Sequence, residues 1–146
     1  MISSLGYGLL NVVAVIPARY ASTRFEGKAI VDIAGKPMIQ HVYERSICAE
    51  KLSQVIVATD DRRIYHVVEG FGGRVVMTPE AETGSDRIAM VAEGMNCEVV
   101  VNIQGDEPLI SPYHIDEVIK YHQKNYDADI ILPTLKVKLP DNPNIV

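Results

Sequence analysis

Residues 12–18 read VVAVIPA, and the next ten residues, 19–28, read RYASTRFEGK. A continuous run of valine and isoleucine, without alternating polar residues, is typical of a parallel strand that is buried on both faces. The composition then changes abruptly, because Arg19, Arg24 and Lys28 follow among small and hydroxylated residues. The stretch therefore predicts a core strand whose carboxyl end carries a basic loop.

Four further apolar runs predict strands at residues 54–58, 74–77, 98–103 and 129–132. Apolar residues at helical spacing occupy the segments 38–49, 62–71, 85–95 and 115–126. A strand followed by a helix, repeated along the chain, predicts an α/β protein with an open, mostly parallel sheet and helices on both faces.

Turn and cap residues punctuate the predicted helices. Residues 35–37 (GKP) open the first helix, and the glycines at 72–73 close the second. Residues 59–61 (TDD) suit a helix cap, and we expect Ser85 to be the N-cap of the third helix. Residues 111–112 (SP) place a cap residue and a first-turn proline before the fourth helix.

Size and composition restrict the class of protein. The chain has 146 residues, of which 47% are hydrophobic, so one compact domain is expected. A net charge of −5 argues against a general nucleic-acid binder. Cys48 and Cys97 have no CxxC spacing and are interpreted as reduced core thiols. No apolar run is long enough to span a membrane, and no basic signal-peptide region precedes the first strand, so we expect a cytoplasmic protein.

The basic loop is a candidate anion site. In an open parallel sheet, ligands bind at the carboxyl ends of the strands, where this loop begins. Arg19, Ser22, Arg24 and Lys28 supply cations and a hydroxyl that suit a polyphosphate. The glycine spacing is neither that of a Walker loop nor that of GxGxxG. A solvated basic loop is the alternative interpretation.

The segment 102–108, NIQGDEP, is a candidate metal site. Its two carboxylates directly follow an apolar strand, and such a position favours a cation as their partner. Mg²⁺ is commonly held by one or two carboxylates together with substrate phosphates, and Asp106 fits that role. A turn with solvated acidic residues is the alternative.

Taken together, these segments resemble a known family. The sequences IPARYASTRFEGKAIVDIAGKPMIQHVYERS, VIVATDD, FGGRVVMT and VVVNIQGDEPLI, in this order, are similar to the 3-deoxy-manno-octulosonate (Kdo) cytidylyltransferases, or CMP-Kdo synthetases. The resemblance runs from about residue 13 to residue 146. It implies a Rossmann-like nucleotidyltransferase fold of the GT-A type. It also implies a Mg²⁺-dependent transferase that moves CMP from CTP to Kdo, releasing pyrophosphate, in lipopolysaccharide synthesis.

The resemblance also implies roles for individual residues. Arg24, Lys28 and Asp106 would act in the chemistry, with Asp106 as the Mg²⁺ ligand. The nucleotide and sugar acid would be bound by Ala18, Arg19, Ser22, Arg24, Lys28, Gly84, Ser85, Arg87 and Gln104. Within this set, Gly84, Ser85 and Arg87 would lie at the cytidine end, and Gln104 would border the sugar acid.

Two departures from the family pattern accompany the resemblance. Glu26 stands where the family commonly has proline, and Thr83 stands where serine is common. The family also continues for about a hundred residues more, at the upper end of ordinary domain size. We therefore expect residues 1–146 to be the nucleotide-binding portion, and the sugar-binding and dimerisation part to be absent. The parent protein is expected to be a homodimer. A nucleotide-binding module without transferase activity, or a related CMP-sugar-acid synthetase, is the alternative.

Overall fold

The computed structural model describes residues 10–21 and 25–134. Its elements are β1 (Val12–Ala18), the 3-10 helix η1 (Lys28–Ile30), β2 (Asp32–Ile33), β3 (Lys36–Pro37), α1 (Met38–Ser46), β4 (Gln54–Thr59), α2 (Arg62–Gly70), β5 (Val75–Met77), α3 (Gly84–Glu93), β6 (Val99–Asn102) and α4 (Pro112–Lys124). None of the helices in these ranges has the length and apolar character that a membrane crossing requires.

The main sheet has four parallel strands in the order β5-β4-β1-β6. The first strand lies in the interior of this sheet, paired with β4 on one side and β6 on the other. The chain therefore builds outward from β1 through β4 to β5, and then returns to the opposite side of β1. This reversal creates a topological switch point beside β1, the place where open α/β sheets bind ligands.

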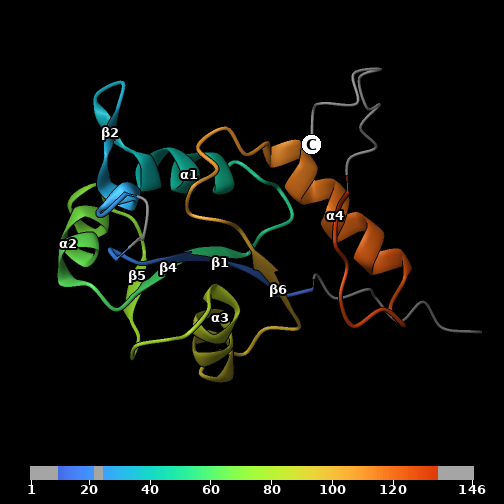
Figure 1. Ribbon diagram of the computed structural model, residues 1–146. Coiled ribbons are helices and arrows are strands. Elements are labelled where there is room, and N and C mark those ends of the chain that lie inside the picture. The colour runs from blue at the N-terminus through green and yellow to red at the C-terminus, as the bar shows by residue number, and fades with distance from the viewer. Residues whose placement is uncertain (1–9, 22–24, 135–146) are drawn as a thin grey trace, which may run out of the picture.

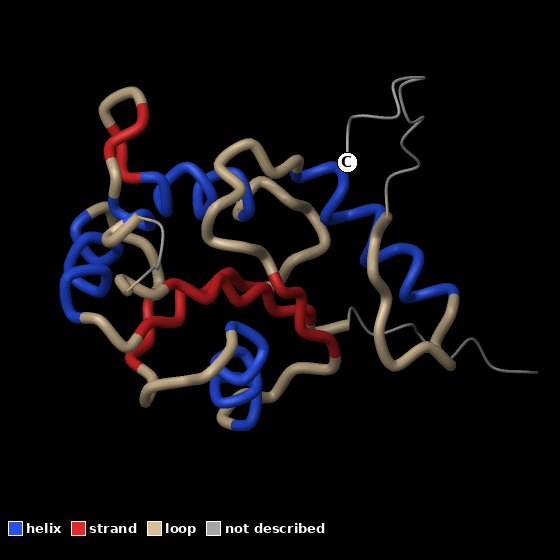
Figure 2. The backbone as a smooth tube through the Cα atoms, viewed as in Figure 1, coloured by secondary structure: helices blue, strands red, loops and turns tan. Residues whose placement is uncertain are grey.

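Helices cover both faces of the sheet, as the sequence predicted (Figure 1). On one face, alternate β1 side chains such as Ala14 and Ile16 join a core that includes residues of α1, α2 and α4. On the other face, Val13 and Val15 pack with Ile88 of α3. Figure 2 shows the strands between these two layers. Because both faces are covered, the apolar run of β1 needs no polar alternation.

One predicted strand is wrong. Residues 129–132 form no strand, and Ile130 and Leu132 are each 78% exposed. A run of apolar residues becomes a strand only when a neighbouring strand pairs with its backbone groups, and the sequence pattern does not supply that partner. The other four predicted strands are confirmed, with ends that differ by one or two residues.

The helix ends confirm some expected caps and correct others. Asp61 caps α2 by accepting a hydrogen bond from the backbone N–H of Arg63 at 2.8 Å. Ser85 is not the N-cap of α3, because Thr83 occupies that position in a reciprocal capping box with Asp86. The helix starts earlier than predicted because this box satisfies two backbone donors at once.

The expected state of the cysteines is partly corrected. Cys48 and Cys97 are both free thiols, as predicted. Cys48, however, is exposed and not in the core, and Cys97 is half-buried. Cys48 lies just after the end of α1, and the neighbouring residue that enters the core there is Ala49.

A short hairpin that the sequence did not predict precedes α1. Strands β2 and β3 pair antiparallel, and residues Ala34 and Gly35 between them have positive φ values of 51° and 84°. Two successive left-handed residues are typical of the tight turns that match the twist of a hairpin. Asp32 accepts a hydrogen bond from the Gly35 backbone N–H at 3.1 Å, which reinforces the turn.

Candidate active site

Two cavities lie where β1 and β6 end. Their volumes are about 190 and 110 Å³, and both are lined by Pro17, Ala18, Arg19 and Gln104. Because these residues form a wall common to both, the cavities are neighbouring parts of one site. This position matches the switch point beside β1, as expected for a ligand site in an open parallel sheet.

The larger cavity contains the predicted cationic and acidic groups. Lys28 and Asp106 both line it, together with Ala29, Met38 and Gly105. Lys28 Nζ donates to Asp106 Oδ2 at 2.7 Å, and both side chains are about half exposed. The structure therefore brings the end of the basic loop into contact with the acidic turn after β6.

Gly105 allows the acidic turn to approach β1 closely. A Cβ atom at this position would lie 3.0 Å from the backbone oxygen of Pro17 and 3.5 Å from Ile39 Cδ1. The first distance is too short for an ordinary contact with backbone, which has little freedom to move away. Gly105 thus fits the close packing that places Asp106 beside the cavity.

The smaller cavity is formed against the start of α3. Thr83, Gly84 and Arg87 line it together with Ala81 and the shared residues. A Cβ atom at Gly84 would lie 3.3 Å from Pro17 Cγ, so glycine permits close contact between the helix and β1. The beginning of this helix carries partial positive charge, which favours an electron-rich ligand in the cavity.

Arg87 is the buried charge of the site, with an exposed fraction of 3%. Its Nη2 donates to Asp60 Oδ2 at 2.7 Å, and its Nη1 donates to the Thr78 hydroxyl and, at 3.4 Å, to the Pro79 carbonyl. The guanidinium therefore connects α3 to the residues that follow β4 and β5. This arrangement holds the walls of the smaller cavity together.

Of the other predicted site residues, some line the cavities and others do not. Arg19 and Gln104 are exposed side chains on the shared wall, and Gln104 Nε2 donates to Asn102 Oδ1 at 3.0 Å. Ser85 is exposed and is not among the residues that line either cavity. Ser22 and Arg24 lie outside the described residues.

The larger cavity offers one carboxylate that could serve a metal ion. No group of three or more His, Cys, Asp or Glu side chains suitable for a metal occurs among residues 10–21 and 25–134. Asp106, however, places one accessible carboxylate in the larger cavity. One carboxylate is enough for Mg²⁺ when substrate phosphates and water complete its oxygen shell.

Several residues of the site escaped the sequence analysis. Met38 and Ala29 line the larger cavity, and Asp60 and Thr78 bind Arg87. Asp60 was expected only to cap a helix, and no local signal linked it to an arginine 27 residues further along the chain. For Met38 the only signal was its position after GKP, at the start of a helix.

Two relatives with similar sequences are named as cytidylyltransferases. The 3-deoxy-manno-octulosonate cytidylyltransferase of Geotalea uraniireducens is 52% identical over 94% of this chain and 56% of its own length. The 8-amino-3,8-dideoxy-manno-octulosonate cytidylyltransferase of Shewanella halifaxensis is 46% identical over 93% of this chain and 57% of its own. The chain thus spans a little over half the length of these relatives.

A solved structure supports the same relationship. A CMP:2-keto-3-deoxy-manno-octonic acid synthetase complexed with CTP superposes with a TM-score of 0.78 at 43% identity, over 80% of this chain and 48% of the other. Residues 13–142 match the sequence pattern of the cytidylyltransferase family. The family match begins within β1 and includes the other strands of the main sheet and both sides of the site. The chain therefore belongs to the cytidylyltransferase family.

Proposed function

We propose that this chain binds CTP and provides the nucleotide site for transferring CMP to Kdo or a closely related sugar acid, with release of pyrophosphate. The observation that carries the proposal is the convergence of Arg19, Lys28 and Asp106 on one cavity, beside a second cavity at the start of α3. Two relatives act on different octulosonates according to their names, so the identity of the sugar acid is part of the proposal.

The residues suggest how the nucleotide would lie. The larger cavity would take the triphosphate, because Arg19 and Lys28 supply positive charge there. The smaller cavity would take the cytidine end, because it lies against the start of α3, where Gly84 packs closely on Pro17. Arg87 would support this cavity from its buried position and not by a free guanidinium.

The chemistry required is an in-line displacement at the α-phosphorus. The oxygen of the sugar hydroxyl bonds to the α-phosphorus and gives up its proton, the bond from the α-phosphorus to the bridging oxygen breaks, and pyrophosphate leaves. The cations of the larger cavity would neutralise the charge that develops on the departing group. The chain thus positions the triphosphate and screens its charge.

Asp106 would hold Mg²⁺ with the phosphates, and the ion would add charge neutralisation at the triphosphate. Asp106 here accepts a hydrogen bond from Lys28, so a metal ion and this ammonium group would compete for one carboxylate. With Asp106 engaged in this way, Lys28 would be available to the phosphates.

The remaining parts of the function are also proposals. Residues 1–146 would form the nucleotide-binding portion, and the sugar acid would need contacts from the part of the relatives that this chain does not span. A homodimer is proposed for the parent protein. This assignment predicts that the chain binds CTP without transferring CMP.

Calorimetric titration of CTP into the chain, with and without Mg²⁺, tests the proposal. In the presence of Mg²⁺, Lys28→Ala and Asp106→Ala should each weaken binding about tenfold or more, because the first removes a cation that contacts the phosphates and the second removes the proposed Mg²⁺ ligand. Lys120→Ala is the matched control, because Lys120 forms a similar exposed ion pair with Glu117 at 2.8 Å on α4. A folded chain that does not bind CTP, or equal affinities in all variants, would contradict the proposed function.

A further inference from the structure

Tyr20 makes an unusual set of contacts just after β1. The guanidinium carbon of Arg63 lies 3.2 Å from the centroid of the Tyr20 ring. The same ring lies close to Gly27, since a Cβ atom there would be 3.1 Å from Tyr20 Cε2. One aromatic side chain thus contacts both helix α2 and the far end of the basic loop.

Arg63 is held over the ring by Asp61. Its Nη2 and Nε donate to the two carboxylate oxygens of Asp61 at 2.7 and 3.0 Å, so the pair is bidentate. Asp61 in turn is fixed as the N-cap of α2. Asp61, then Tyr20 and Glu26, raise the pKa of Arg63. The guanidinium is therefore oriented by the helix start.

The backbone closes the base of the basic loop at the same place. Gly27 N–H donates to the Tyr20 carbonyl at 2.8 Å, which joins the two ends of the loop. Gly27 has a φ of 71° and is the N-cap of η1, whose first residue is Lys28. Helix α2 also contacts η1. A contact that holds Tyr20 against Gly27 therefore also fixes the backbone position of Lys28.

We propose that Arg63 and Tyr20 form a clamp that positions Lys28 for the triphosphate, with Asp61 orienting the arginine. Arg63 is a positioning residue: it acts on the nucleotide through Tyr20 and the closed loop base. This role rests on the proposed function, whereas the clamp itself can be tested without a nucleotide.

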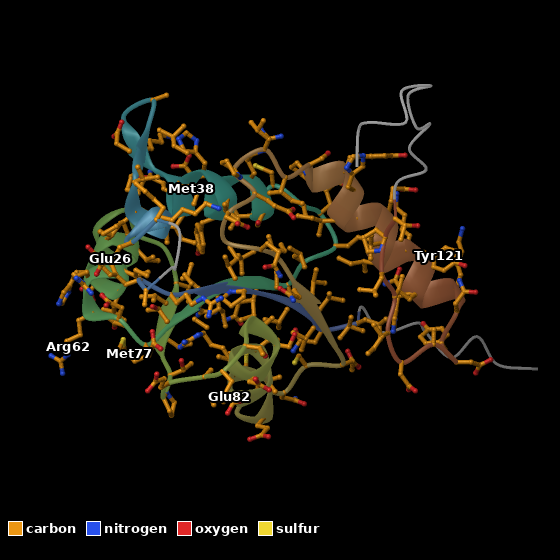
Figure 3. The ribbon with its side chains drawn as sticks, viewed as in Figure 1. Glu26, Met38, Arg62, Met77, Glu82 and Tyr121 are labelled. Carbon is orange, nitrogen blue, oxygen red and sulfur yellow. The ribbon has the colours of Figure 1, made fainter. Side chains whose placement is uncertain are left out.

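Amide hydrogen exchange at Gly27, measured by NMR on the nucleotide-free chain, tests the clamp. Arg63→Ala and Tyr20→Leu should each speed exchange about two- to fivefold, the range that corresponds to one exposed cation–π contact. Tyr20→Phe keeps the ring and should exchange like the wild type. Arg62→Ala is the matched control, since Arg62 is the preceding residue and points away from the body of the molecule (Figure 3).

The affinity for CTP relative to CMP tests the positioning role. Arg63→Ala should weaken CTP binding about two- to fivefold and leave CMP binding unchanged, because the clamp acts on the cation that faces the outer phosphates. Equal losses for CTP and CMP would indicate a general structural effect and overturn the positioning role. Tyr20→Phe, which keeps the ring, should bind CTP and CMP in the wild-type ratio.

The two readouts separate the possible failures. Unchanged exchange at Gly27 in Arg63→Ala would overturn the clamp, whatever the nucleotide does. Faster exchange with an unchanged CTP affinity would overturn the positioning role alone. If exchange is faster in Arg63→Ala but the wild-type chain does not bind CTP, the proposed function is overturned, and the positioning role with it.

Discussion

Replacing Arg87 by methionine should destabilise the chain strongly, even though no nucleotide is present. Methionine keeps much of the volume of the side chain and removes its charge. The change leaves the carboxylate of Asp60, the hydroxyl of Thr78 and the carbonyl of Pro79 without the donor that they share. The folded state is destabilised because these three groups lose a hydrogen-bond donor at a site where water can solvate them only in part.

The size of the effect follows from the burial of the two charges. Removing one partner of a buried ion pair costs about 3–5 kcal/mol. The exposed fractions are 3% for Arg87 and 28% for Asp60, so water can partly solvate the remaining carboxylate. We therefore expect a loss of about 3 kcal/mol, at the lower end of the range. For a chain of this size, the melting temperature should fall by about 9 °C.

Urea unfolding at neutral pH measures this loss, with Arg62→Met as the control at an exposed position of α2. The control should change the free energy of unfolding by less than about 0.5 kcal/mol. The double variant Arg87→Met with Asp60→Asn should recover about 1 kcal/mol or more, since the unpaired charge is gone. A loss below about 1 kcal/mol for Arg87→Met, or additive losses in the double variant, would refute the reasoning.

Two further predictions concern the loop base and the start of α2. Gly27→Ala should lower the free energy of unfolding, measured in urea, by about 1–2 kcal/mol, because its φ is 71° and Tyr20 crowds the new methyl group. Gly72→Ala is the control: its φ is 78° but the space around it is open, so it should lose only the stability that backbone strain costs. Equal losses in the two variants would exclude a role for the Tyr20 ring. Hydrogen bonds from Arg63 lower the pKa of Asp61, so this carboxylate stabilises the fold above its ordinary pKa of 3.8, and the contribution is lost as the pH falls through the lower folded value. An acid titration of stability should therefore be shallower in Asp61→Asn than in the wild type, and identical curves would contradict this assignment.

Local sequence patterns predicted most of the strands and helices, because the apolar run of a buried strand and the apolar period of a helix are both set by residues close together in the chain. The apolar run of β1 requires burial on both faces, and the periodic apolar residues of α2 and α3 supply the two covers. The strand predicted at residues 129–132 failed for the complementary reason. Its pattern was present, but strand formation requires a partner strand, and the sequence pattern does not show whether one is available.

The sequence by itself determined the class of fold, the strand ends that carry polar groups, and the family to which the chain belongs. Only the tertiary structure decided which polar groups meet. Lys28 and Asp106 are 78 positions apart, and Arg87 and Asp60 are 27 apart, yet each pair is joined by a 2.7 Å contact. Parallel strands need long crossover connections, so side chains at adjacent strand ends are distant in sequence. Their pairing depends on strand order and on helix packing, which no local period encodes.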